Sequence, residues 1–263
     1  MRPRNLIIPA TGGVLLEADY SQLEVRVLAE LSQDEVLLDD LASGRDMHRY
    51  FAGLIYGLPA SMVSDAQRRT AKGMSFQLQY GATPYGIAQS FKIPVDKAEE
   101  FVVNYYNRYR GVKEFQDDLI ETVRKNRTPA HPNAKSWYQS PITKRKYVFF
   151  ETRNKRGEYE FRAPAIKNYI VQGTATGDIV PLALGRLMRY FLESNLTILN
   201  TVHDSVLFEC EEEVAHDVAR KIVKVMADAP RYVKEVWGYD WKTPLPVDVK
   251  IGPNWGDMKE IKV

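Results

Sequence analysis

The segment NTVHDSVLFEC, residues 200–210, places polar side chains inside a run of strand-forming residues. Val202 precedes His203 and Asp204, and the apolar run VLF follows one residue later. β-branched and aromatic residues favour a half-buried strand, whereas a carboxylate is costly to bury unless a partner stabilises its charge. The segment therefore predicts two strands that meet at His203–Asp204, and it requires a neutralising group beside Asp204.

A second acidic residue, Asp19, ends the apolar segment VLLEAD (14–19) near the other end of the sequence. Strands from both ends of a chain can pair in one sheet, so Asp19 and Asp204 can become neighbours. Two carboxylates about 4 Å apart repel by about 4 kcal/mol at an effective dielectric of 20, unless they share a proton or a cation. Oxygen ligands without a histidine or cysteine cluster favour Mg²⁺, and two such ions can stabilise the attacking and leaving oxygens of a phosphoryl transfer.

Each carboxylate also has a purely structural explanation. Ser21 and Glu24 fit a capping box, so that Asp19 could simply mark a strand-to-helix turn. Similarly, His203 and Asp204 could simply form a turn, without any role in catalysis. A hydrolase triad made of His203, Asp204 and Ser205 is disfavoured, because adjacent strand side chains point to opposite faces and no G-x-S-x-G segment is present.

The segment QRRTAKGMSFQLQYG, residues 67–81, predicts a helix with an unusual face. Arg68, Lys72, Phe76 and Tyr80 recur at steps of four and form one slanted stripe, because a helix turns 100° per residue. The two cations suit a triphosphate, and the two rings suit a base or a sugar. The alternative is a core position for the rings and a solvated position for the cations.

Composition sets broad limits on the kind of protein. The chain has 263 residues, 44% of them hydrophobic, with a formal charge of +2. Residues 124–156 carry ten lysines and arginines but only one acidic residue, which is typical of either a solvated loop or a phosphate-binding patch. The single cysteine, Cys210, excludes an internal disulfide, and no apolar run approaches the roughly 18 residues of a membrane span. We therefore expect a cytoplasmic protein that is not inserted in a membrane.

The order of elements predicts an α+β fold, in which an antiparallel sheet is interrupted by a helical block. Apolar spacing favours strands at 14–19, within 146–152, at 197–202 and 205–210, and at 246–251. It favours helices at 22–32, 46–56, 64–79, 96–126, 165–194 and 211–228.

Five segments together resemble the family A DNA polymerases, the bacterial repair and phage replication type. They are EADYSQLEVRVLAELS, DMHRYFAGLIYG, RRTAKGMSFQLQYGATPYGIA, NYIVQGTATGDI and TVHDSVLFE, and they occur in the family's order at about its spacing. The resemblance extends from about Arg2 to Trp255. It implies a hand-like enzyme that adds dNTPs to a primer 3′ hydroxyl on a template, with palm segments at 1–35 and 165–263 and fingers at 36–164.

The resemblance also implies roles for individual residues. Asp19, Asp204 and the carbonyl of Tyr20 match ligands of two Mg²⁺ ions. Lys72 matches a proton donor to pyrophosphate, and Glu24 matches the side chain that closes the space for a ribose 2′ hydroxyl. The remaining matches are nucleotide contacts at His48, Arg68, Lys72, Phe76 and Tyr80, and primer-template contacts at Gly81, Asn168, Gln172 and His203.

The sequence departs from the family pattern in composition and in length. Ser205 stands where the family usually has glutamate, and Pro164 stands where it usually has arginine. The family's thumb, the first part of its palm and a proofreading exonuclease have no counterpart, so we expect the C-terminal portion of a split or truncated polymerase and a second protein chain that supplies the missing parts. The alternative is a non-catalytic, polymerase-like subunit that binds nucleic acid. A reverse transcriptase or an RNA polymerase is a third option. Glu24 disfavours ribonucleotides, and the sequence around Asp204 is not the paired-aspartate hairpin of reverse transcriptases.

Overall fold

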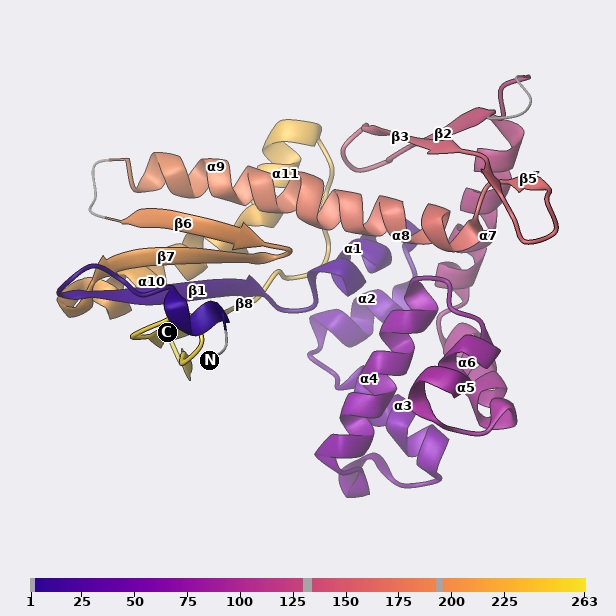
Figure 1. The fold of residues 1–263 in the computed structure, drawn as a ribbon, viewed down its shortest axis with the longest axis horizontal. Coiled ribbons are helices and arrows are strands. Elements are labelled where there is room, and N and C mark those ends of the chain that lie inside the picture. Colours follow the sequence, from indigo (N-terminus) through magenta and orange to yellow (C-terminus); the bar gives the residue numbers. More distant parts are fainter. Residues whose placement is uncertain (1–2, 130–133, 193–195) are drawn as a thin grey trace. The chain divides into compact units, whose positions relative to one another are not determined.

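The computed structural model describes residues 3–129, 134–192 and 196–263. The chain folds into two compact units, one formed by residues 1–27 and 173–263 and the other by residues 28–172. The fold is α+β with an antiparallel sheet, as the order of elements predicts (Figure 1).

The first unit is organised around one five-stranded sheet with the order β6-β7-β1-β8-β9. All neighbouring strands are antiparallel, and β1 lies between a strand of the hairpin and a strand from the end of the chain. The expected pairing of distant strands is therefore confirmed. The strands are β1 (Gly13–Tyr20), β6 (Thr197–Val202), β7 (Ser205–Glu211), β8 (Val247–Gly252) and β9 (Lys259–Ile261).

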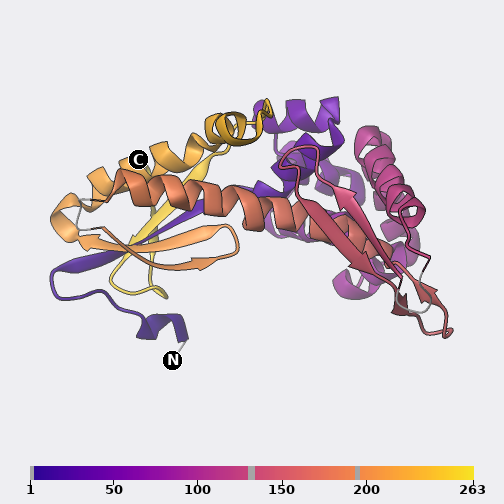
Figure 2. The same cartoon turned by 90° about the horizontal axis from the view of Figure 1, so that it is seen from above.

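One face of this sheet is apolar and is covered by helix α10 (Ala215–Ala227), which contacts β1, β7 and β8 (Figure 2). Leu16, Ala18 and Phe208 are fully buried on this face. The hydroxyl of Tyr20 donates a 2.8 Å hydrogen bond to the carbonyl of Met226 in α10. Because strand side chains alternate, Asp19 points to the opposite face.

The helices of the first unit follow the apolar spacing only in part. Helix α1 (Leu23–Ser32) begins directly after β1, and α9 (Val180–Tyr190) follows a π-helical turn at Ala175–Ile179. The segment 165–194 predicted one regular helix, so the π-helical turn is a difference, and the last two residues of that prediction lie outside the described residues. Helix α11 (Ala229–Trp237) and strand β9 were not predicted from the spacing. Two short 3₁₀ turns at Pro3–Leu6 and Glu212–Val214 complete this unit.

The second unit is mainly helical and has an aromatic core. The ring of Phe51 lies 5.2 Å from that of Tyr105 and 5.7 Å from that of Tyr109. The helices are α2 (Glu35–Ala42), α3 (Met47–Tyr56), α4 (Asp65–Gln79), α5 (Pro84–Phe91), α6 (Val95–Arg108), α7 (Arg110–Lys125) and α8 (Ala163–Thr174), with a 3₁₀ turn at Ala60–Met62.

The expectation of one helix over 96–126 is wrong, because the chain breaks at Tyr109 between α6 and α7. Tyr109 has φ −109° and ψ 68°, and its buried hydroxyl donates a 2.8 Å hydrogen bond to Asp40. A Cβ on Gly111 would lie 3.0 Å from the Cα of Asp34, so the next turn packs tightly against another segment. Tertiary contacts therefore override a spacing that favours a continuous helix.

Two small hairpins occupy residues 134–160, where the sequence predicted a single strand. Strand β2 (Lys135–Gln139) pairs with β3 (Lys146–Phe150), and β4 (Thr152–Arg153) pairs with β5 (Tyr159–Glu160). The predicted segment KYVFFET contains β3 and the start of β4. Its partner strand was missed because its short alternation, KSWYQ, carries few aliphatic residues.

None of the helices in residues 3–129, 134–192 and 196–263 combines the length with the hydropathy that a membrane span needs.

Candidate active site

The end of β1 and the turn between β6 and β7 bring the two predicted carboxylates together. Asp19 is paired with Ser205 across the two strands, and the backbone amide of Tyr20 donates a 3.3 Å hydrogen bond to the carbonyl of Asp204. His203 and Asp204 form the two-residue turn, in which His203 has φ 55°. The turn therefore holds the carboxylate of Asp204 beside that of Asp19, although 185 positions separate them in sequence.

The electrostatics of this pair agree with the expectation that the two carboxylates need a positively charged partner. Burial and the nearby Asp204 carboxyl raise the pKa of Asp19 from 3.8 to about 6, and a hydrogen bond between the two carboxyl groups adds to the rise. The ammonium of Lys250 opposes it only in part. One carboxyl oxygen of Asp19, Oδ1, is buried without a hydrogen-bond partner. Adjacent carboxylates with an unpartnered buried oxygen suit a divalent cation with oxygen ligands.

Residues beside the pair are held in place by hydrogen bonds of their own. The Tyr20 side chain is fixed on α10 by its hydrogen bond to Met226, and the Tyr20 amide is bonded to the carbonyl of Asp204. The hydroxyl of Ser205 donates a 3.0 Å hydrogen bond to the carbonyl of Val202, so it stabilises the turn. Among the residues that the structure describes, no three His, Cys, Asp or Glu side chains are grouped as metal ligands.

Two residues at the start of α1 extend this site. Burial and then the Asp204 carboxylate raise the pKa of Glu24, while His203 lowers it. Glu24 therefore lies within the electrostatic reach of Asp204. Gln22, which the sequence did not single out, has φ 58° and a buried Oε1 without a hydrogen-bond partner. In the sequence, Gln22 is distinguished only by its position directly after the segment DYS, residues 19–21.

Replacing Asp19 with Asn is expected to stabilise the metal-free protein at pH 7–8. The pKa of Asp19 is higher in the folded state, so folding favours its protonated form. Wild type therefore loses stability as the pH rises from about 4 through about 6, and the uncharged asparagine side chain of the variant avoids that loss. The full shift corresponds to about 3 kcal/mol, and partial solvent exposure reduces the expected gain to about 1–2 kcal/mol.

Urea unfolding in EDTA at pH 4, 6 and 8 measures this effect. The difference in unfolding free energy between Asp19→Asn and wild type should be small at pH 4 and should grow toward pH 8. A constant difference across this range would contradict the repulsion between the two carboxylates.

In the second unit, α4 presents the predicted stripe of cations and rings. Ser64 caps the helix through a capping box with Gln67, which fixes its first turn. Ala71, Met74 and Leu78 are buried on one side. The stripe residues Arg68, Lys72, Phe76 and Tyr80 are all half-buried, and the ammonium of Lys72 lies 5.6 Å from the centre of the Phe76 ring.

Two residues from the start of α3 contact this stripe. Asp46 caps α3 by accepting a 3.0 Å hydrogen bond from the amide of Arg49, and it also accepts a 2.6 Å hydrogen bond from Arg68 Nε. Although burial opposes the effect, these hydrogen bonds lower the pKa of Asp46. Asp46 thus holds the Arg68 guanidinium in place, a role that the sequence did not predict because Asp46 reads equally well as a simple helix cap.

His48 lies on the same side of α4 as the Phe76 ring, with 6.3 Å between the ring centres. Burial, followed by the charges of Lys72 and Arg68, lowers the pKa of His48 to about 4. Both ring nitrogens are buried and have no hydrogen-bond partner. A neutral imidazole beside two cations is suited to donate a hydrogen bond to an anion, as predicted for a histidine near the triphosphate.

The end of α4 and the helix α8 place the predicted DNA contacts of this unit. Tyr80 caps α4, and Gly81 follows with φ 81°. A Cβ on Gly81 would lie 2.8 Å from the Cα of Pro164, so only glycine fits there. Asn168 has a buried Oδ1 without a partner, and Gln172, one turn further along α8, is half-buried.

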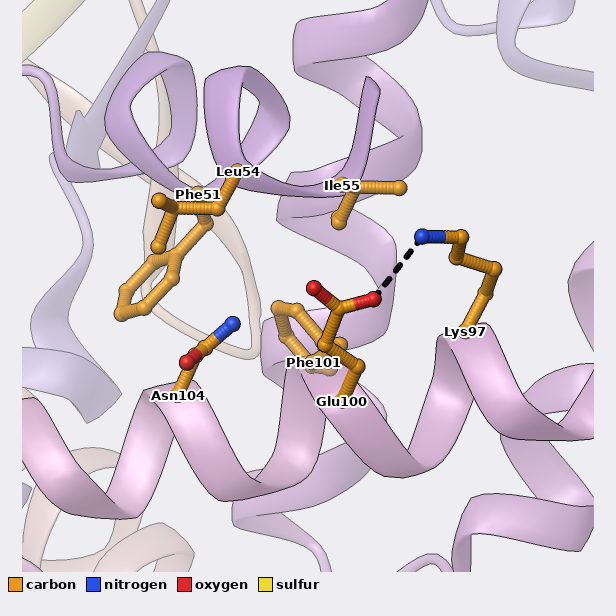
Figure 3. Close-up of a pocket in the computed structure, with 7 residues that line it drawn as sticks. All are labelled: Phe51, Leu54, Ile55, Lys97, Glu100, Phe101 and Asn104. Atoms are coloured by element: carbon orange, nitrogen blue, oxygen red, sulfur yellow. Dashed lines mark hydrogen bonds and ion pairs between the residues drawn. The ribbon is translucent and has the colours of Figure 1, made fainter. Parts of the chain in front are cut away.

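A pocket between α3 and α6 contains none of the predicted site residues (Figure 3). Phe51 and Phe101 pack edge to face beneath it at 5.8 Å, and Lys97 forms a 2.8 Å ion pair with Glu100 at its rim. The pocket does not admit a water-sized sphere, so it is a packing gap and not a ligand site.

Within each unit, buried polar atoms without partners mark candidate site residues more directly than pocket shape does. In the described ranges, every such side-chain atom belongs to Asp19, Gln22, His48 or Asn168. Unpartnered buried polar groups are costly and rare in folded proteins, and each requires an explanation. Three of these four residues were predicted from the sequence as metal, nucleotide or DNA contacts.

Comparison with known proteins identifies the family to which the chain is related. The model of the family described as DNA polymerase family A matches residues 1–257. DNA polymerase I of Caldicellulosiruptor bescii is 33% identical over 261 residues, which cover 97% of this chain and 28% of the relative. The thermostable DNA polymerase I of Thermus aquaticus is 31% identical over 98% of this chain and 29% of its own. The chain thus spans less than a third of the length of these relatives.

A solved structure shares the fold as well. The POL domain of Pol1 from M. smegmatis, in complex with DNA primer-template and dNTP, superposes with a TM-score of 0.78 at 27% identity. The match covers 96% of this chain and 42% of the other. Because the family model spans almost the whole sequence and the fold agrees, the chain belongs to DNA polymerase family A.

Proposed function

We propose that this chain catalyses template-directed DNA synthesis by adding dNTPs to a primer 3′ hydroxyl. The observation that carries the proposal is the Asp19–Asp204 pair, with its raised pKa and its unpartnered buried oxygen. We assign the palm to residues 1–35 and 165–263 and the fingers to residues 36–164. Family membership supports this reaction class, and the related enzymes are named DNA polymerase I.

Asp19, Asp204 and the carbonyl of Tyr20 would hold two Mg²⁺ ions. When bound, these ions favour the deprotonated primer hydroxyl and neutralise the charge that develops on the phosphates and the leaving pyrophosphate. The protein supplies a rigid frame for this chemistry, because Asp19 ends a central strand and Asp204 is held in a two-residue turn.

The side chains of α4 and α3 would bind the incoming nucleotide. Arg68, positioned by Asp46, and His48 would contact the triphosphate. Lys72 would also donate a proton to the leaving pyrophosphate. It lies on the same face of α4 as Arg68, one turn further along the helix, so its ammonium would also face the phosphates. Phe76 and Tyr80 would pack against the sugar and base, and Glu24 would exclude a ribose 2′ hydroxyl.

The primer-template would be contacted by Gly81, Asn168, Gln172 and His203. Gly81 lets the helix end approach closely, because it carries no side chain and has a positive φ. Asn168 and Gln172 offer amide groups, which can accept and donate hydrogen bonds at base edges. The unpartnered Oδ1 of Asn168 supports this assignment.

Primer extension tests the function. The chain is incubated with a primer-template, the four dNTPs and Mg²⁺, alone and with a candidate partner chain, beside Asp204→Ala. Extension that requires Asp204 supports the proposal. If neither condition gives extension but DNA binding is retained, the chain is instead a non-catalytic subunit. Ser205 in place of glutamate is the observation that favours this alternative.

Phe76→Tyr is expected to improve the use of dideoxynucleotides relative to dNTPs by about 10- to 100-fold. The new phenolic hydroxyl can replace the hydrogen bond that a missing 3′ hydroxyl would make to a charged phosphate, which is worth about 1.5–3 kcal/mol. The ratio of kcat/KM for ddNTP and dNTP on one template measures this effect, and the dNTP value serves as the internal control. An unchanged ratio would argue against a position of Phe76 beside the sugar.

We also propose that a second protein chain, supplying a thumb and the first part of a palm, covers apolar surface of the first unit. Strand β6 is an edge strand with Leu199 exposed, and Tyr190 and Leu192 are exposed nearby at the end of α9. A cavity of about 340 Å³ lies beside them, lined mainly by apolar side chains that include Val214 and Val218. A chain that remains a monodisperse monomer in light scattering and is fully processive by itself would contradict this proposal.

A further inference from the structure

The outer face of the β2–β3 hairpin in the second unit exposes apolar and aromatic side chains among cations. The strand register pairs Lys135 with Phe150 and Trp137 with Val148, so these four side chains share one face. Trp137 is 40% exposed, Val148 is 43% exposed and Phe150 is 63% exposed. This concentration of exposed rings has no role in the site described above and marks an interaction surface.

The inner face of the same hairpin is fixed by packing, so the exposed rings are not a loosely folded core. Tyr147 and Phe149 are buried, and both rings meet Tyr169 of α8 edge to face, at 5.2 and 5.8 Å. Tyr169 itself remains 50% exposed. The hairpin and α8 therefore form a rigid support that presents rings to the solvent.

A cavity of about 320 Å³ adjoins these rings. Its walls include Val148, Phe150, Phe161 and Tyr169, and Arg162 lies at its edge. This volume falls within the range of pockets that bind small molecules, about 300–1,000 Å³. The site thus combines open flat rings with a recess large enough for a base.

The charge of this region selects the ligand class. Residues 124–156 contain ten lysines and arginines, and their single acid, Glu151, is already bound by Arg127 at 2.6 Å. The ammonium of Lys146 lies 4.8 Å from the centre of the Trp137 ring. In the part of the chain that the structure describes, neither Lys135 nor Lys146 forms an ion pair with a carboxylate. The surface is therefore complementary to a polyanion with flat apolar groups.

We propose that this outer face and the cavity beside it bind single-stranded DNA. Bases would stack on Trp137 and Phe150 and, at the cavity, on Tyr169, with phosphates beside Lys135, Lys146 and Arg162. Rings that alternate with cations suit single strands, because every base offers a stacking face and the backbone is anionic throughout. Paired bases in a duplex cannot reach the rings in this way. Since the proposal rests on the proposed polymerase function, the expected ligand is the unpaired part of a template.

Binding of a fluorescein-labelled 15-nucleotide oligo(dT) to the full chain, followed by anisotropy, tests the proposal. The double variant Trp137→Ala/Phe150→Ala should bind at least about tenfold more weakly than wild type, because the loss of stacking on each of the two rings weakens binding by about fivefold or more. Tyr190→Ala, which removes an exposed ring of the other unit, serves as the matched control and should bind as wild type does. Trp137→Phe should retain affinity but lose the quenching of tryptophan fluorescence that stacking causes.

A second comparison separates this proposal from the polymerase function itself. Affinity for a primer-template with a 12-nucleotide 5′ overhang should fall in the double variant, whereas affinity and extension with a one-nucleotide overhang should not change. Equal losses on both substrates, equal binding of a blunt duplex, or capture of a protein partner without oligo(dT) binding would each overturn the proposal. If the alanine variant fails to fold, Trp137→Leu/Phe150→Leu retains the apolar surface without the rings and must show the same overhang-dependent loss.

Discussion

Replacing Asp204 with Asn is expected to lower the rate of nucleotide incorporation by at least about 10³-fold, with little change in DNA affinity. The substitution preserves the shape of the turn but removes one of the two charges that would hold the divalent ions. Ions at such sites contribute several kcal/mol to the transition state, and each 1.36 kcal/mol corresponds to a factor of ten in rate. Single-turnover incorporation of one dNTP, measured with saturating enzyme, gives the effect on the chemical step.

A neighbouring carboxylate provides the matched control for this variant. Asp248 is exposed and is aligned with Asp19 in the adjacent strand β8, but it is not among the groups that shift the pKa of Asp19. Asp248→Asn removes the same charge from the same sheet and should change the rate by less than about threefold. Near-equal effects of Asp204→Asn and Asp248→Asn would show that general charge, and not the aspartate pair, determines activity.

Lys72→Ala is expected to lower kcat by about 10²- to 10³-fold, whereas Arg68→Ala should mainly raise KM for the dNTP. General acid catalysis typically contributes 10²- to 10⁴-fold, and the loss of a phosphate contact alone weakens binding. Lys72→Arg keeps the charge but has too high a pKa to give up its proton readily, so it should restore KM more than kcat. Steady-state kinetics with a single correct dNTP separate these outcomes.

The control for Lys72 lies on the same helix. Arg69 is exposed, outside the stripe of Arg68, Lys72, Phe76 and Tyr80. Arg69→Ala changes the charge of α4 by the same amount and should leave kcat and KM near wild type. A kcat for Lys72→Ala that matches that of Arg69→Ala would remove Lys72 from the chemistry.

Much of the fold could be predicted from local patterns. The apolar strands around Asp19 and Asp204 and the regular spacing of α4 each arise from contacts between near neighbours in sequence. The break at Tyr109 could not be predicted in this way, because it depends on the hydrogen bond to Asp40 and on the packing of Gly111 against Asp34. The strands of the small hairpins were partly missed for a related reason, since their outer faces carry rings and cations instead of a regular polar pattern.

The residues of the candidate sites differ in the same way, because some could be predicted from local patterns and others could not. Asp19 and Asp204 can be recognised in the sequence because they are acidic residues in apolar strand segments. The structure brings these two residues together. Asp46 and Gln22 carry no comparable signal, because a helix cap and a residue after a strand are ordinary features. Their importance follows only from the hydrogen bond to Arg68 and from the unpartnered Oε1 of Gln22.

The most direct test of the account is the number of divalent ions that bind with the substrates. Mn²⁺ binding is measured by electron paramagnetic resonance with primer-template and a non-hydrolysable dNTP analogue, for wild type and for Asp19→Asn. We predict two bound ions per wild-type chain at saturation and the loss of at least one in the variant. Wild type that binds no ion, or an Asp19→Asn variant that binds the same number with the same affinity, would contradict the account.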